Sequence, residues 1–241
     1  MEMKLINENI FNINFVPNKI NTIISSNKIL VSSFFDLIYN KRNSKEVKCN
    51  DIFYVKEDIS GMLFNINVLG DIKYYIKKIN QEKLNELLKM FNLSSNICDK
   101  NYIELSNSEA RKILIIIALM IDSKIIILDN PIVSLDYQSV QSLIKQLKKI
   151  KREDKTIILT SHDTNFLLEV SDKIWVINEN KILNEGDKYE IFSNEKLLSD
   201  INLKVPNVLD FINKVKDIKN IKLGYRDNIN DLIKDIYRYA K

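Results

Sequence analysis

Short apolar runs alternate with amphipathic stretches along this chain. The apolar runs predict strands, and the amphipathic stretches, with apolar positions three and four apart, predict helices. Strands that alternate with helices are typical of a mostly parallel sheet covered by helices. The predicted strands are Lys19–Ser25, Ile52–Val55, Lys124–Asp129, Thr156–Thr160 and Lys173–Asn178, and the predicted helices are Ser32–Asn40, Gln81–Phe91, Ser106–Ile121, Tyr137–Lys151 and Thr164–Val170.

Two regions depart from this alternation. Residues 65–105 read as helical and predict a subdomain inserted into the α/β core, which extends over about 65–122 when the next helix is included. After Gly186 the pattern becomes a series of short amphipathic helices that ends in a polar, helix-forming tail. We therefore expect one domain over residues 1–215 and a C-terminal helical tail over 216–241.

Composition excludes some classes of protein and leaves others open. Cys49 and Cys98 are isolated, and His162 is the single histidine, so we expect no disulfide scaffold, no His-based metal cluster and a reducing cytosol. The longest apolar run, Ile113–Ile121, is half of a membrane span, so membrane association would require a partner. The net charge of +4 fits an anionic partner weakly and an ordinary mixed-charge surface equally well.

Four short motifs follow one another with room for one helix or one strand between them. An Asp at the end of a central strand can hold Mg²⁺, and a Ser at a helix N-terminus can meet an anion. A His just after a strand can contact a phosphate. The motifs are Leu105–Glu109 (LSNSE), Leu128–Pro131 (LDNP), Ser134–Asp136 (SLD) and Thr160–Asp163 (TSHD).

In this order the motifs resemble the signature, Walker B, D-loop and switch-histidine motifs of ABC ATPases. The resemblance implies a P-loop NTPase-like fold that binds ATP and Mg²⁺. It implies Asp129 as a metal ligand, His162 as a catalytic residue at the γ-phosphate, and nucleotide contacts from a set of polar residues: Ser106, Asn107, Glu109 and Asp136. The plainer alternative is that Ser106 only caps a helix, with Glu109 completing a capping box.

The phosphate-binding loop of the family has an altered counterpart after the first predicted strand. The resemblance keeps Asn27, Ser32 and Ser33 as nucleotide-binding residues, with Ser32 also as a metal ligand. Val31 stands in place of the lysine, which removes a contact worth about 1.5–3 kcal/mol. The glycines are replaced by Ser25, Lys28 and Leu30, although such a cradle often needs positive φ angles that glycine tolerates best.

Two further positions depart from the family pattern. Asn130 stands where the family has its water-polarising Glu, and an amide can position water but cannot accept its proton. Lys56 stands in place of the Q-loop Gln and is expected to contact nucleotide. Because the first strand comes early in the chain, we expect part of the N-terminal hairpin to be missing. Phe11 and Phe15 are the nearby candidates for adenine stacking, and core packing is the better interpretation of both.

Two stretches are most similar to energy-coupling-factor ATPases within this family. They are residues 57–80, which contain Leu63–Phe64 and Asp71–Ile72, and residues 170–215, which contain Gly186 and Pro206. The resemblance implies a head-to-tail dimer with a second ATPase subunit, beneath a transmembrane coupling subunit at the cytoplasmic face of the membrane. Generic amphipathic packing is the alternative for the second stretch.

Three hypotheses follow for the activity. The first is a weakly catalytic or non-catalytic subunit that completes the ATP site of its partner. The second is a structural or regulatory ABC-fold module without nucleotide. The third is an active homodimer in which both sites carry the altered loop.

Overall fold

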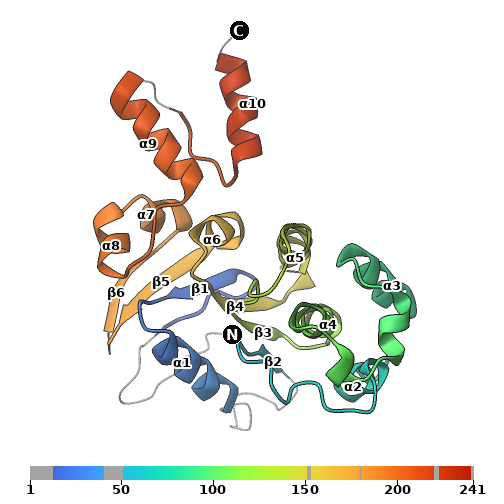
Figure 1. Cartoon of the computed structure of the whole chain (residues 1–241). Helices are drawn as coiled ribbons and strands as arrows, with labels where there is room; N and C mark the ends of the chain where they lie inside the picture. Colours follow the sequence, from blue (N-terminus) through green and yellow to red (C-terminus); the bar gives the residue numbers. More distant parts are fainter. Residues whose placement is uncertain (1–12, 41–50, 151–152, 180, 220–222, 240–241) are drawn as a thin grey trace.

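The computed structural model describes residues 13–40, 51–150, 153–179, 181–219 and 223–239. Six strands form one sheet in the order β2-β3-β4-β1-β5-β6 (Figure 1). All neighbouring strands are parallel except β5 and β6, which form an antiparallel edge. The strands are β1 (Ile20–Ile24), β2 (Ile52–Val55), β3 (Ile125–Asp129), β4 (Thr156–Thr160), β5 (Lys173–Asn178) and β6 (Lys181–Gly186). The predicted mostly parallel α/β fold is confirmed.

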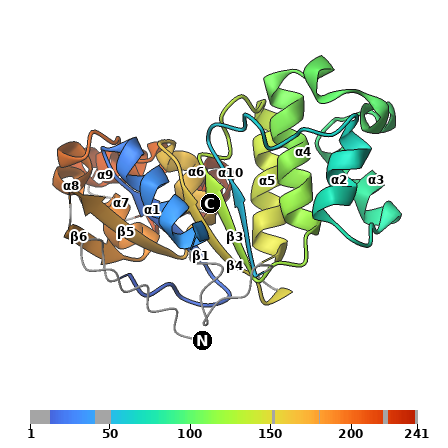
Figure 2. The same cartoon turned by 90° about the horizontal axis from the view of Figure 1, so that it is seen from below.

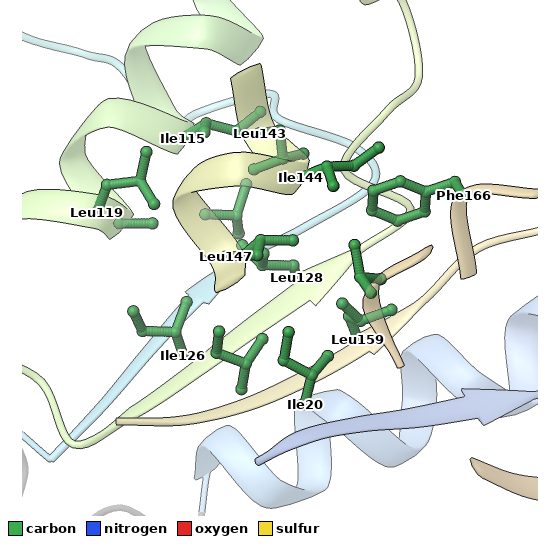
Figure 3. Close-up of a cluster of buried hydrophobic side chains, with 14 of the residues drawn as sticks. Ile20, Ile115, Leu119, Ile126, Leu128, Leu143, Ile144, Leu147, Leu159 and Phe166 are labelled. Carbon is green, nitrogen blue, oxygen red and sulfur yellow. The ribbon is translucent and has the colours of Figure 1, made fainter. Parts of the chain in front are cut away.

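Helices α4 (Asn107–Met120), α5 (Tyr137–Ile150) and α6 (Thr164–Val170) cover one face of the sheet. Alternate strand residues point into this layer, as the two-residue period of a strand requires. Figure 3 shows Ile126 and Leu128 of β3 beneath Leu143 and Leu147 of α5. The expected central strand is buried, and only Ile125 at its start is partly exposed.

Helix α1 (Lys28–Asn40) covers the opposite face of the sheet (Figure 2). This second core is rich in aromatic side chains and takes the other set of alternate strand residues. Its members include Phe15, Val31, Phe34, Phe35, Tyr54, Ile127 and Trp175. The rings of Phe15 and Trp175 meet edge to face with centroids 5.6 Å apart. Phe15 is therefore a core residue, and Phe11 lies outside the described residues.

The region after β2 is helical, as predicted, and lies beside the sheet at the end nearest α4 and α5. It contains α2 (Val68–Tyr75), α3 (Gln81–Met90) and two short 3-10 turns, η2 (Ser95–Asp99) and η3 (Tyr102–Glu104). The chain beyond β6 forms α7 (Lys188–Phe192), α8 (Glu195–Asp200), α9 (Asn207–Lys219) and α10 (Ile229–Tyr239). Among the described residues, no helix is both long and apolar enough to span a membrane.

The element boundaries agree with the sequence within one residue at most ends, and α1 is the exception. The sequence predicted a helix from Ser32, whereas α1 begins at Lys28. The Asn27 side chain accepts the N–H of Leu30, as an N-cap side chain does, so the loop residues before Ser32 join the helix. The loop between β1 and α1 is correspondingly short.

Candidate functional site

A cleft opens where β1, β3 and β4 end at the same edge of the sheet. Ligands of open α/β sheets bind at this edge, outside the carboxyl ends of the strands. The cleft holds about 200 Å³ of empty space, open solvent included. Its lining residues come from the start of α1 and from the ends of β2, β3 and β4: Lys28, Val31, Glu57, Asp129, Asn130, Thr160, Ser161 and His162.

Three main-chain N–H groups in the loop before α1 and in its first turn donate hydrogen bonds within the chain. The N–H of Asn27 donates to Ser25 Oγ at 3.1 Å, and the N–H of Leu30 donates to Asn27 Oδ1 at 3.2 Å. The N–H of Val31 donates to the Asn27 carbonyl at 3.4 Å. These three donors are therefore engaged within the chain.

Asp129 lies buried at the end of β3, where the sequence places it. Its Oδ2 atom accepts hydrogen bonds from Ser32 Oγ at 2.7 Å and from the Tyr54 hydroxyl at 3.2 Å. The backbone of Glu57 also lowers the pKa of this carboxylate. Burial raises the pKa of Asp129 above its usual value, and these donors oppose that shift. Ser32 and Asp129, the two predicted metal ligands, are thus brought together.

The Glu57 carboxylate lies opposite Asn130 in the cleft. Its Oε1 atom accepts a hydrogen bond from Asn130 Nδ2 at 3.2 Å and lies 3.5 Å from Lys28 Nζ. Asn130 itself has a positive φ of 46°, a conformation that Asn adopts more readily than most residues. The amide at the position of the family carboxylate therefore faces a carboxylate from the neighbouring strand end.

Arg111 fixes the backbone that carries Glu57. This side chain of α4 is buried, and its Nη1 atom donates to the Lys56 carbonyl at 2.8 Å while its Nη2 atom donates to the Glu57 carbonyl. Two parallel N–H donors on a planar guanidinium hold two adjacent carbonyls in one orientation. The residues after β2 are therefore held against α4 independently of the Glu57 side chain.

The residues after β4 form the far wall of the cleft. Ser161 Oγ donates to Asn130 Oδ1 at 3.3 Å, and the N–H of Asn130 donates to the Thr160 carbonyl at 3.1 Å. His162 is exposed at the cleft. Partial burial and the Lys28 charge lower the pKa of His162, so its imidazole is neutral at pH 7. His162 and Asn130, the two predicted catalytic positions, thus line one cleft.

The signature residues lie on a different surface, at the N-terminus of α4. Ser106 caps this helix: its Oγ accepts the Glu109 N–H at 3.2 Å, and Glu109 Oε2 accepts the Ser106 N–H at 2.9 Å. That main-chain hydrogen bond is the largest cause of the lowered pKa of Glu109. Ser106 and Asn107 are both exposed. The capping box weighed in the sequence analysis is therefore present, and the capping residues still face solvent.

Asp136 immediately precedes α5, and its carboxylate remains exposed while it accepts hydrogen bonds from two residues. Oδ2 accepts from the buried Lys112 Nζ at 2.7 Å, and Oδ1 accepts from the Ser139 N–H at 2.9 Å. The Lys112 hydrogen bond holds the pKa of Asp136 well below its usual range. Ser134, two residues earlier, has a φ of 64°. The predicted D-loop is thus a tight turn with its acidic residue fixed in place.

The cleft lining lacks four predicted nucleotide-binding residues of the chain's own site, namely Asn27, Ser32, Ser33 and Lys56, although the Ser32 hydroxyl reaches Asp129. Lys56 Nζ pairs with Asp36 of α1 at 2.8 Å and lies 5.5 Å from the centre of the Tyr54 ring. Ser33 is exposed on α1. Sequence reasoning missed Glu57, Tyr54 and Arg111. A carboxylate directly after a strand end was the available signal for Glu57, whereas the contacts of Tyr54 and Arg111 depend on tertiary structure.

The polar groups of the cleft that would meet Mg-ATP are bonded to one another in this structure. Asp129 Oδ2 already has two side-chain donors, and loop donors that could face phosphates bond to Ser25 and Asn27. Asn130 and Lys28 both face the carboxylate of Glu57. A magnesium nucleotide would have to displace these internal contacts, and Val31 offers no charge for the phosphates.

No family model matches the chain, but comparison with known proteins finds homologues. The chain is 32% identical over 177 residues to a putative ABC transporter ATP-binding protein of Clostridium acetobutylicum, covering 70% of this chain and 62% of the relative. It is 30% identical over 197 residues to an energy-coupling factor transporter ATP-binding protein of Oenococcus oeni, covering 79% of this chain and 66% of the relative. The chain thus spans slightly less than two thirds of each relative.

Solved structures agree on the fold. A subunit from Clostridium perfringens, described as part of an ABC transporter complex, has a TM-score of 0.61 at 21% identity, covering 84% of this chain and 90% of that one. A dimeric bacterial ABC transporter cassette has a TM-score of 0.62 at 18% identity, covering 74% and 90% respectively. The chain therefore has the ABC ATPase fold, and its homologues include ABC and energy-coupling factor transporter ATP-binding proteins.

Proposed function

We propose that the chain is the weakly catalytic or non-catalytic ATP-binding subunit of an energy-coupling-factor-like ABC transporter. In this role it pairs with a second ATPase subunit and completes the ATP site of that partner with Ser106 and Asp136. The named relatives are transporter ATP-binding proteins, and a dimeric cassette is among the similar structures. Both facts support a dimeric transport ATPase.

One observation carries the asymmetric role. Ser106 and Asn107 are exposed at the N-terminus of α4, which can offer N–H groups and a favourable dipole to a phosphate brought by another subunit. The chain's own cleft instead has its donors bonded internally. The signature face is therefore available to a partner, while the cleft of this chain is occupied by its own side chains.

An exposed apolar surface supports a membrane partner. Ile66 is 87% exposed and Tyr74 is 65% exposed, and the ring of Tyr74 meets Phe64 with centroids 4.9 Å apart. These residues follow β2, beside the helical region, where the family resemblance places the contact with a coupling subunit. Association there would hold the chain at the cytoplasmic face of the membrane through its partner, and Ile66→Asp would abolish co-purification with that subunit.

The test is ATP hydrolysis by the chain co-purified with an intact ABC ATPase. Ser106→Arg is expected to lower turnover at least 100-fold, because it places bulk and charge where a phosphate is held closely. Ser94→Arg is the matched control: Ser94 is exposed in the helical region, makes no capping hydrogen bond, and its replacement should leave turnover within twofold.

A third variant separates the two faces of the same chain. Ser32→Ala removes a hydroxyl from the chain's own cleft and should change turnover less than twofold. Loss of turnover with Ser32→Ala but not with Ser106→Arg would mean that this chain's own cleft is the working site. If neither variant matters, or if no ABC ATPase partner forms a complex, the alternative of a nucleotide-free structural module is favoured. Loss of the Ser106 cap costs about 1 kcal/mol, so thermal melting of each variant checks that it remains folded.

A further inference from the structure

Glu57 has no role in the motifs of the chain, yet its carboxylate lies at the centre of the cleft. Oε1 accepts from the Asn130 amide at 3.2 Å and lies 3.5 Å from the Lys28 ammonium. Its side chain is 32% exposed, so it is neither a free surface group nor sealed from solvent. A single carboxylate thus engages both the cation and the amide donor of the cleft.

The backbone of Glu57 is held by contacts that do not involve this carboxylate. Arg111 donates to the carbonyls of Lys56 and Glu57. The backbone of Glu57 is therefore fixed, and its side chain lines the cleft. Replacing the carboxylate by an amide of the same size therefore preserves the local fold while removing one negative charge.

Charge in the cleft also disfavours an incoming anion. Lys28 is the one lysine or arginine among the lining residues that the structure describes. The carboxylates of Glu57 and Asp129 outnumber it. A phosphate group that entered would meet two carboxylates, with the ammonium already paired to one of them.

We propose that Glu57 is an internal anion that occupies the phosphate-facing groups of this chain's own site and excludes Mg-ATP from it. This proposal deepens the proposed function and rests on it for the identity of the excluded ligand. It makes Glu57 the residue that determines whether the cleft accepts a phosphate. Exclusion of Mg-ATP depends on the negative charge of Glu57, because an amide at this position would leave Lys28 unpaired and the cleft less negative.

The test is Mg-ATP binding to the purified chain, measured by isothermal titration calorimetry. Glu57→Gln is expected to tighten binding at least tenfold over the wild-type chain. Glu86→Gln, at an exposed position on α3, is the matched control and should leave affinity unchanged. Inorganic tripolyphosphate is titrated as a second probe, and an equal gain with it assigns the new contacts to phosphate rather than to the base. Unchanged or weaker binding by Glu57→Gln overturns the proposal.

A double variant tests whether Lys28 is the released cation. In Glu57→Gln/Lys28→Gln the gain in affinity should disappear, since no unpaired ammonium remains to meet the phosphates. If the full gain persists, the ion pair is not what excludes the nucleotide, and the proposal fails. This result is independent of the mixed-dimer assay. An effect of Ser106→Arg without a gain from Glu57→Gln leaves the proposed function standing alone.

Discussion

Two regions of the molecule carry different motifs: the cleft at the ends of β1, β3 and β4, and the exposed N-terminus of α4. They differ in the groups to which their polar side chains bond. In the cleft, Ser32, Asn130 and Lys28 bond to carboxylates of the same chain. At α4, Ser106 is bonded only within its own capping box and remains exposed. The contacts in the cleft join side chains from separate elements, whereas the capping box lies at one exposed helix end, where a partner can reach it.

Arg111 and Lys112 are adjacent in the sequence, and both are buried. Arg111 bonds to the main chain beside the cleft, and Lys112 bonds to Asp136. Arg111→Met should destabilise the chain by about 2–4 kcal/mol, because it leaves two main-chain carbonyls without their donor. Lys112→Met should cost about 1 kcal/mol or less, since the carboxylate it leaves is exposed to water. Urea denaturation of both variants measures the difference, and equal costs would contradict it.

Tyr54→Phe tests whether internal donors hold the end of β3. The phenol donates to Asp129 Oδ2 at 3.2 Å, and burial raises its pKa, so it remains a donor at any ordinary pH. Removing it should cost about 1–2 kcal/mol, because the ring keeps its packing while a buried carboxylate loses one donor. Tyr237→Phe, at an exposed position on α10, is the control for loss of a hydroxyl. An equal cost for the two variants in thermal denaturation would show that the Asp129 contact adds nothing.

Asp136→Asn tests how the D-loop carboxylate contributes to stability at different pH values. The folded pKa of Asp136 lies below its unfolded value of about 3.9, so its contribution is present above that pH and is lost as the pH falls toward the folded pKa. The variant should be less stable than the wild-type chain by about 0.5–1 kcal/mol at pH 7, and the difference should shrink at pH 3. Denaturant melts at both pH values measure it. A difference that grows on acidification would have the wrong sign.

Lys56→Met should have the smallest effect. The Lys56–Asp36 pair is almost half exposed at both ends, so its loss should change stability by less than about 0.5 kcal/mol. Because the Lys56 side chain lies away from the cleft lining, Mg-ATP affinity should also remain unchanged in calorimetry. A tenfold change in affinity would place Lys56 in the nucleotide site, as the sequence alone predicted.

The fold was predictable from the sequence because the apolar periods of its central elements are strong. The run that ends at Asp129 and the helix capped by Ser106 were both placed within one residue. The start of α1 was not, since it depends on Asn27 capping a helix in a loop that usually contains glycines. The grouping of Asp129, Asn130 and His162 followed from their places at or just after strand ends and from the family resemblance. The orientation of the Lys56 side chain and the contacts of Glu57 and Arg111 were not predictable, because they depend on rotamers and long-range packing.

Val31 has a consequence for any attempt to restore a lysine at its position. It stands where the resemblance places a lysine, and it is 3% exposed in the aromatic core beneath α1. Burying a valine contributes about 1.5–3 kcal/mol, and a lysine returning to this position would forfeit part of that packing and bring a charge to the core. Val31→Lys is therefore expected to lower the stability of the chain unless neighbouring core residues change with it.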